Sequence, residues 1–263
     1  MKVLVLGHRG MLGHVVSRYL SDQGMEVMTT EMRYKGAPDD ELISAVRDSE
    51  AAWIVNGIGK IKQKSADQFD LFLANAQMPA HLRLFLRPDQ RLIHASTDCV
   101  FSGRQGDYRV DDYRDAGDLY GLSKILGEIS AELGRCQVIR TSIIGPELGK
   151  PSGLMGWFLD QEKQVNGFTN HLWNGVTTLE WAKICEAIIC GNLRPTSPIL
   201  QTGSSDKISK CELLELIGEL WPHPVRVHPT EAKDRVDRTL RPELVRAPLR
   251  QQIQELRDWY PFK

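Results

Sequence analysis

The stretch KVLVLGHRGMLGHVVSRYLSDQG, residues 2–24, carries the strongest indication of the fold. It opens with a short apolar run over 2–7, of the length of a buried strand, and continues with apolar residues at helical spacing until Gly24. A glycine-rich turn joins the two parts. A strand that leads through a tight turn into a helix begins a βαβ unit, so this segment predicts the start of a parallel α/β sheet.

Further strand-like runs follow along the chain, with helical stretches between them. The expected strands are EVMTT at 26–30, AAWIV at 51–55, RLIHAS at 91–96 and CQVIRTS at 136–142. The expected helices include 68–86 and 119–133 and, farther on, 179–190 and 209–220. Strands that alternate with helices are typical of a doubly wound parallel sheet.

Composition narrows the class of protein. The chain has 263 residues, 41% of them hydrophobic, a net charge of -1 and a pI near 6.7. These values give no electrostatic footprint for nucleic acid or for an anionic membrane, and the apolar runs fall far short of the roughly 20 residues of a membrane span. The five cysteines show no metal-ligand spacing. We expect a cytoplasmic protein with no nucleic-acid partner, no membrane partner and no metal.

The turn GHRGMLG, residues 7–13, has the pattern G-x-x-G-x-x-G. Its glycines let the backbone approach a pyrophosphate, whose charge lies at the helix N-terminus where free N–H groups and the helix dipole favour it. The loop residues expected to contact the cofactor are Gly7, Arg9, Gly10, Met11, Leu12 and Gly13. The pattern therefore predicts a Rossmann-type dinucleotide-binding domain over 1–145, to which a segment near 172–195 is expected to return. A smaller C-terminal α/β substrate lobe is expected over most of 146–263.

The residues after the second strand leave the choice of dinucleotide open. Glu31 follows the last glycine at close to the spacing of about 20 residues expected for an acidic residue on the adenosine ribose, which favours NAD. Arg9, Arg33 and Lys35 could instead hold a 2′-phosphate, which favours NADP. We expect NADPH or NADH as cofactor.

The sequence LYGLSK, 119–124, places Tyr120 and Lys124 on one face of a helix. A cation near a phenol lowers the phenol pKa and makes it a usable acid, although an amphipathic helix face with a snorkelling lysine has the same spacing. Thr97, with Ser96 beside it, follows the fourth strand, where its hydroxyl could hydrogen-bond a substrate carbonyl that Tyr120 protonates. Lys124 would also hold the nicotinamide ribose. Thr97, Tyr120 and Lys124 are the predicted catalytic set.

In this order the motifs resemble those of the extended short-chain dehydrogenases/reductases, and most closely the dTDP-4-dehydrorhamnose reductase branch. The resemblance is carried by GHRGMLG, STDCVFSG, the DD at 111–112 before LYGLSKILGE, and IRTSIIG. It implies an NAD(P)H-dependent reductase of a nucleotide-activated 4-keto-6-deoxyhexose, in deoxysugar synthesis for cell-surface polysaccharide. It places Val100 and Phe101 near the substrate pocket and Asn56 at the cofactor. The expected binding partner is a nucleotide sugar, and the chain could also pair with a second copy as a homodimer.

Three segments carry alternative interpretations. After the third strand NGIGKIKQKS departs from the family, and one of Lys60, Lys62 and Lys64 could face a phosphate or all could lie in a polar loop. In VDRTLRPE, Arg238 or Arg241 could clamp the sugar diphosphate or form a surface ion pair. The threonines at 177 and 178 are expected to cap a helix.

Single residues and the chain length help to distinguish a reductase from other functions that the same fold supports. Sugar-nucleotide dehydratases usually carry T-D-E, where this chain has Cys99 in the third position, so dehydration is disfavoured. Epimerases are usually longer. A non-catalytic dinucleotide-binding regulatory subunit is disfavoured because the whole set of Thr97, Tyr120 and Lys124 is present.

Overall fold

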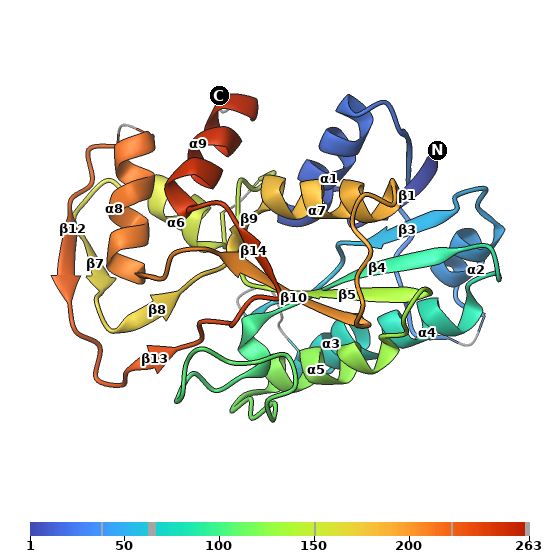
Figure 1. The fold of residues 1–263 in the computed structure, drawn as a ribbon, viewed down its shortest axis with the longest axis horizontal. Coiled ribbons are helices and arrows are strands. Elements are labelled where there is room, and N and C mark those ends of the chain that lie inside the picture. Colours follow the sequence, from blue (N-terminus) through green and yellow to red (C-terminus); the bar gives the residue numbers. More distant parts are fainter. Residues whose placement is uncertain (38, 63–66, 150, 222, 261–263) are drawn as a thin grey trace.

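The computed structural model describes residues 1–37, 39–62, 67–149, 151–221 and 223–260 (Figure 1). Its centre is a seven-stranded sheet with the order β14-β10-β5-β4-β3-β1-β2, in which all paired neighbours run parallel. The strands are β1 (Lys2–Leu6), β2 (Glu26–Thr29), β3 (Trp53–Asn56), β4 (Arg91–Ser96), β5 (Cys136–Arg140), β10 (Ile199–Ser204) and β14 (Leu244–Arg246). The expected doubly wound α/β fold is confirmed.

Helices cover both faces of the sheet because successive strand residues point to opposite sides. Val3 and Val5 of β1 pack in one apolar cluster with α1 and α7, whereas Leu4 and Leu6 pack in another with α2 and α4. Figure 1 shows α1 and α7 above the sheet, and α4 and α5 below it. The bounds are α1 (Met11–Asp22), α2 (Glu41–Asp48), α4 (Met78–Phe85), α5 (Leu119–Gly127) and α7 (Thr178–Ile189). Burial on both faces explains the nearly continuous apolar strands.

The strand order reverses between β1 and β3. The chain runs from β1 to β2 on one side, and then through β3, β4 and β5 on the other. In open parallel sheets, ligands bind at the carboxyl ends of the strands beside such a reversal. The glycine-rich turn 7–13 follows β1 directly, so it lies at this point.

The stretch 68–86, expected as one helix, is divided in three. It consists of α3 (Gln68–Phe72), a π-helical turn η2 (Leu73–Gln77) and α4. Asn75 of the π-helical turn is fully buried; its amide donates to Lys60 O at 2.9 Å and to Ser123 Oγ at 3.0 Å. The side chain that interrupts the helix thus fastens it to the loop after β3 and to α5, which periodicity alone does not indicate.

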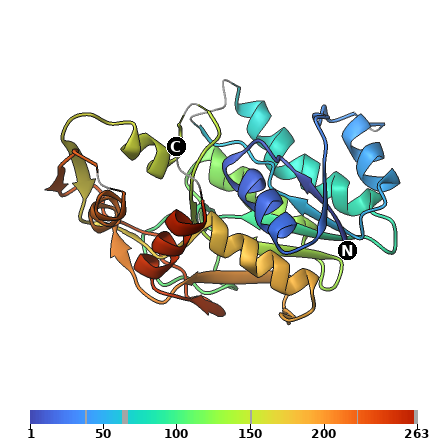
Figure 2. The ribbon, with the colours of Figure 1, turned by 90° about the horizontal axis from the view of Figure 1, so that it is seen from above.

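The remaining elements form a smaller lobe at one side of the sheet domain (Figure 2). Its core packs apolar residues of α6, α8 and α9 against short strands. The bounds are β6 (Ile143–Ile144), α6 (Leu154–Leu159), β7 (Val165–Phe168), β8 (His171–Trp173), β9 (Val176–Thr177), β11 (Ile208–Ser209), α8 (Lys210–Leu220), β12 (Val227–Thr230), β13 (Val236–Asp237) and α9 (Leu249–Trp259). Within the described residues, no helix combines the length and apolar character needed to cross a bilayer.

The chain returns to the large sheet more than once after residue 145. Besides α7, which lies in the expected returning segment 172–195, β10 and β14 also join that sheet. Each pairs in parallel with its inner neighbour, β10 with β5 and β14 with β10. The run ILQTG at 199–203 predicts a strand, which β10 confirms, whereas the return of β10 and β14 to the large sheet depends on pairing that only the folded chain provides.

Candidate active site

The turn after β1 has the shape of a pyrophosphate cradle. Gly7 adopts a positive φ of 76°, and its carbonyl accepts a hydrogen bond of 2.8 Å from the amide of Gly10, the residue that precedes α1. A Cβ on Gly13 would lie 2.2 Å from that same carbonyl oxygen, so only glycine permits this approach of helix to strand. Among the described residues no side chain caps α1, so its first N–H groups stay available to an anion. The loop therefore fits a dinucleotide.

The two residues that favoured opposite cofactors are paired with each other. The Glu31 carboxylate accepts from Arg9 Nη2 at 2.6 Å and lies 3.2 Å from His8 Nε2. Both members of the Arg9–Glu31 pair are exposed, and Arg33 is exposed as well. The Glu31 carboxylate after β2 and the Arg9 guanidinium after β1 thus lie at one place, the first suited to a ribose hydroxyl and the second to a phosphate.

Asn56, expected at the cofactor, lies buried at the end of β3. Its Nδ2 lies 3.0 Å from His94 Nδ1, and its Oδ1 accepts from the Ile58 amide at 3.0 Å. These contacts make Asn56 the residue that shapes the loop after β3. A direct contact between Asn56 and a cofactor stays a prediction.

Thr97 and Tyr120 meet where β4 ends and α5 begins. Thr97 caps the short 3₁₀ turn η3 (Asp98–Val100): its hydroxyl accepts from the Cys99 amide at 3.2 Å and donates to the Asp98 carboxylate at 3.0 Å. A Cβ on Gly121 would lie 2.3 Å from Cys99 O, so glycine next to Tyr120 lets α5 approach η3 closely. The two hydroxyls predicted to act on one substrate oxygen are therefore neighbours.

The environment of Tyr120 keeps its phenol protonated. Burial raises the pKa of Tyr120, as does the nearby Cys99, whereas a side-chain hydrogen bond with Thr97 lowers it. The phenol pKa is thus raised and not lowered as expected, because burial outweighs the other contributions; the role of Lys124 beside Tyr120 stays a prediction.

Lys124 is buried beneath the site. Its Nζ donates to Ala95 O of β4 at 2.6 Å. Burial lowers the pKa of Lys124 to about 8, while the Glu128 carboxylate opposes this shift. A lysine with this pKa loses its charge not far above neutral pH.

Glu128 anchors a buried charge network next to the site. It accepts from Arg140 Nε at 2.8 Å and Nη2 at 2.7 Å, and from Arg114 Nη1 at 3.0 Å. Ser96 Oγ also donates to Glu128, at 2.6 Å. The Ser96 hydroxyl, expected at the substrate, is thus directed into this network and supports the strand end from below.

Val100 and Phe101, expected near the substrate, are fully buried. The Phe101 ring stacks on that of Tyr108 with a centroid distance of 4.2 Å, and Leu240 completes this small core. These side chains form the support of the loop after η3. They present no surface to a ligand in this structure.

The two arginines Arg238 and Arg241 of VDRTLRPE lie in different environments. Arg238 donates from Nε to Phe101 O at 3.0 Å and lies near Cys99 and Asp118, beside the catalytic candidates. Arg241 is exposed and pairs with Asp107, with an Nε–Oδ2 distance of 2.9 Å. Of the two expected alternatives, Arg241 takes the surface ion pair.

The lysines after β3 also lie in ion pairs. Lys60 pairs with Asp70, and Lys62 Nζ lies 2.7 Å from Asp118 Oδ2. Lys64 lies outside the described residues. Farther along, the hydroxyl of residue 177 accepts from the Glu180 amide at 3.2 Å, so the expected cap of α7 is confirmed.

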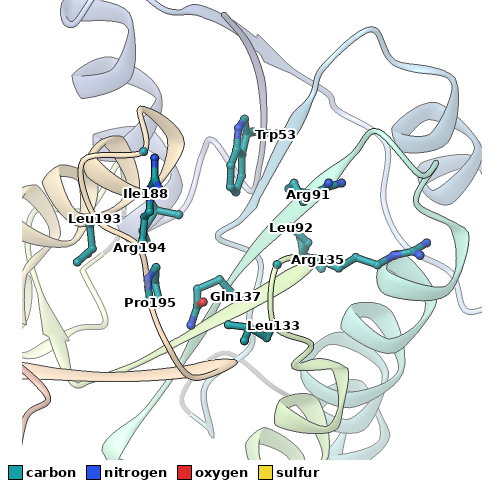
Figure 3. Close-up of a pocket in the computed structure, with 12 residues that line it drawn as sticks. Trp53, Arg91, Leu92, Leu133, Arg135, Gln137, Ile188, Leu193, Arg194 and Pro195 are labelled. Atoms are coloured by element: carbon teal, nitrogen blue, oxygen red, sulfur yellow. The ribbon is translucent and has the colours of Figure 1, made fainter.

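A cavity of about 360 Å³ lies at the opposite end of the strands (Figure 3). It includes Trp53 and Arg91, the first residues of β3 and β4, and in Figure 3 the Arg135 side chain runs away from Trp53. With a rise of about 3.3 Å per residue, the chain from Arg91 along β4 puts this cavity roughly 20 Å from Thr97. Its size does not make it the reaction site, because it contains none of the paired hydroxyl and ammonium groups.

Sequence patterns missed Asn75 and Glu128 beside the site, and also Lys210, which interacts electrostatically with Asp98 and Cys99. Asn75 and Glu128 are buried polar residues within helical stretches, and such residues need partners. That requirement could have marked both, although not their partners. Lys210 begins α8 of the smaller lobe, and nothing in its sequence surroundings distinguishes it from a surface lysine.

The family described as "RmlD substrate binding domain" matches the chain over residues 1–259. A curated relative, the spore coat polysaccharide biosynthesis protein SpsK of Bacillus subtilis, is 32% identical over 151 residues, which are 54% of this chain and 52% of that protein. The chain thus spans about half the length of the curated relative it matches.

Solved structures share the fold over nearly the whole chain. A dTDP-4-dehydrorhamnose reductase from Bacillus anthracis, in complex with NADP, has a TM-score of 0.81 at 15% identity, covering 98% of each chain. The reductase from Clostridium acetobutylicum gives 0.79 at 16% identity, covering 98% of this chain and 99% of that one. WbmG of Bordetella bronchiseptica, in complex with NAD and UDP, gives 0.73 at 16%, covering 98% and 94%.

Proposed function

The chain belongs to the RmlD substrate binding domain family, and on this basis we propose that it is an NAD(P)H-dependent reductase of a nucleotide-activated 4-keto-6-deoxyhexose. One observation carries the proposal. The hydroxyls of Thr97 and Tyr120 are neighbours at the end of β4, above the buried Lys124, on the edge of the sheet where the glycine-rich turn lies. The similarity to SpsK, named for spore coat polysaccharide biosynthesis, supports a product destined for a cell-surface polysaccharide.

The proposed reaction reduces the C4 ketone of the sugar to an alcohol. The nicotinamide cofactor, when bound, supplies the hydride that the carbonyl carbon takes up. Tyr120 donates its phenolic proton to the carbonyl oxygen as negative charge develops there, and Thr97 hydrogen-bonds the same oxygen. The raised pKa of Tyr120 keeps the phenol protonated before the reaction, so the proton is present to be donated.

Lys124 has two tasks in this proposal. Its ammonium lies on the helix face of Tyr120, where a positive charge stabilises the phenolate that remains after proton transfer. It also binds the nicotinamide ribose. A pKa of about 8 leaves most of the lysine charged at neutral pH, so both tasks are served there.

The glycine-rich turn holds the dinucleotide. Gly7, Gly10 and Gly13 let the pyrophosphate approach the N-terminus of α1, and the Arg9–Glu31 pair meets the adenosine ribose with or without its 2′-phosphate. Relatives of this fold are in complex with NADP in one case and with NAD in another. The proposal therefore includes both cofactors.

The test follows absorbance at the reduced-nicotinamide band. Purified protein is mixed with NADPH or NADH and a panel of 4-keto-6-deoxy sugar nucleotides made in situ by dehydratases. We expect oxidation with at least one member, and a loss of about 10²- to 10⁴-fold in Tyr120→Phe with cofactor affinity unchanged. Tyr113→Phe is the matched control, because Tyr113 is 87% exposed.

Two results would count against the reductase. Full turnover in Tyr120→Phe would remove the phenol from the mechanism. Cofactor binding without oxidation of any panel member would favour an epimerase or a regulatory subunit, since both retain the dinucleotide site.

A further inference from the structure

Lys210 extends from the smaller lobe toward the catalytic candidates of the sheet domain. It is the first residue of α8, after the capping residue Ser209. Its ammonium lies 5.0 Å from the centroid of the Trp173 ring, and it interacts electrostatically with Asp98 and Cys99 of η3. A lysine of the lobe thus reaches the turn that Thr97 caps.

The charge of Lys210 is only weakly compensated. Its side chain is half-buried, and the described part of the chain provides neither a hydrogen bond nor an ion pair within 4 Å. The lysines that pair with carboxylates have exposed or partly exposed side chains; they are Lys2, Lys35, Lys60, Lys62, Lys183 and Lys207. Burial lowers the pKa of Lys210, in agreement with an ammonium that has lost water and gained no acceptor.

Arg238 adds a second cation at the same place. It comes from the segment after β13, and its Nε is fixed by Phe101 O at 3.0 Å. Its two terminal nitrogens have no hydrogen-bond partner among the described residues. The charges of Arg238 and Lys210 repel, since Arg238 contributes to the lowered pKa of Lys210. Two cations that interact electrostatically and have donors without a partner in the described part of the chain are suited to an anion of more than one charge.

We propose that Lys210, together with Arg238, binds the diphosphate of the nucleotide-sugar substrate between the two lobes. This inference rests on the proposed function and adds to it a residue that binds substrate. The diphosphate carries acceptor oxygens for both cations, with the planar guanidinium able to bind two of them and the ammonium acting as a point charge. Trp173 holds the lysine by cation–π contact until the substrate arrives.

The competing view is that Lys210 only tethers the lobes through Asp98. The two roles differ in what they affect: a tether changes stability, whereas a diphosphate contact changes nucleotide affinity. The Asp98 carboxylate already accepts from the Thr97 hydroxyl at 3.0 Å, and its distance from Lys210 exceeds that of an ion pair. This geometry favours the ligand contact.

The experiment titrates dTDP and UDP into the full-length protein saturated with NADP⁺, using calorimetry. In Lys210→Gln we expect Kd for the better nucleotide to rise at least about tenfold, with NADP⁺ affinity and melting temperature unchanged. Lys210→Arg should bind within a few-fold of the wild type, because it keeps the charge. Lys207→Gln is the matched control, since Lys207 is exposed and pairs with Asp107 at 2.9 Å.

The outcomes separate this inference from the reductase proposal. If Lys210→Gln binds the nucleotide as the wild type does, the diphosphate contact is overturned, while Tyr120-dependent turnover still supports the reductase. If the wild type binds neither nucleotide, both the contact and the nucleotide-sugar class fall. Should Lys210→Gln lower the melting temperature, Lys210→Met, which keeps the stem on Trp173, replaces it; unchanged affinity in that variant also overturns the contact.

Discussion

Arg140 and Lys124 are two buried cations at the same edge of the sheet, and they differ in how fully their charges are compensated. Arg140 is 1% exposed and forms two hydrogen bonds with Glu128, with further bonds to Val110 O and Gln201 Oε1. Lys124 is 5% exposed and donates to a single carbonyl, that of Ala95.

The difference separates a structural charge from a functional one. A buried ion is tolerated when its donors are satisfied, as those of Arg140 are. A buried ion with unused donors destabilises the folded protein unless a ligand completes its shell, and such groups gather at functional sites. Lys124 belongs to this second kind.

The largest expected effect is on stability, and it comes from removing Glu128, the carboxylate partner of the buried Arg140. Glu128→Leu leaves Arg140 buried without its carboxylate and should reduce the free energy of unfolding by about 3–5 kcal/mol, measured by urea titration. Glu219→Leu is the matched control and should leave the urea midpoint unchanged, because Glu219 and Arg250 are exposed. A small loss in Glu128→Leu, similar to that of the control, would show that Arg140 does not depend on Glu128.

The next effect concerns Lys124, the cation whose charge is incompletely compensated. Lys124→Met should lower kcat/KM by about a hundredfold or more, yet raise the melting temperature of the cofactor-free protein at pH 7. The reason is that the folded protein must keep a charged ammonium buried there, and methionine removes this cost. A lowered melting temperature, with activity lost, would instead make Lys124 a structural charge like Arg140.

The smallest effect is a pH dependence set by Lys124. Its pKa is about 8 in the folded protein, against 10.5 for an unperturbed lysine, so between these values the unfolded chain binds more protons. The contribution of Lys124 to stability therefore rises with pH across this window. Activity should run the other way, with kcat/KM falling about tenfold per pH unit above pH 8 as the charged form is lost. A profile that stays flat to about pH 10 would contradict the role of the ammonium.

Local patterns predicted the strands β1 to β5 of the large sheet, but they did not predict that β10 and β14 join it. The strands β1 to β5 are bounded by glycine turns and amphipathic helices, and their apolar runs follow from burial on both faces. By contrast, β10 and β14 occur in a turn-rich region, and they join the sheet through parallel pairing with distant strands. Such non-local pairing leaves little trace in the sequence nearby.

The prediction of the site was most successful for residues that belong to motifs whose order along the chain is required by the function. Gly7, Gly13, Thr97, Tyr120 and Lys124 lie along one edge of the sheet because each follows or faces a strand end. The prediction was less successful for residues that were chosen only because they lie next to these motifs in the sequence. Ser96, Val100 and Phe101 are neighbours of Thr97 in the chain, but their side chains are directed into a charge network or a small core.

The parallel α/β fold, the glycine-rich cradle and the order of the catalytic candidates follow from the amino-acid sequence, because they depend on periodicity and on residues close together in the chain. Which charges are compensated depends on the folded structure. Arg241 pairs with Asp107 and Arg140 with Glu128, whereas Lys210 and Arg238 lie near Cys99 without an ion pair in the described part of the chain. Whether two charged residues form a pair depends on distances of a few ångströms in the folded protein. The spacing of the residues along the chain does not specify these distances.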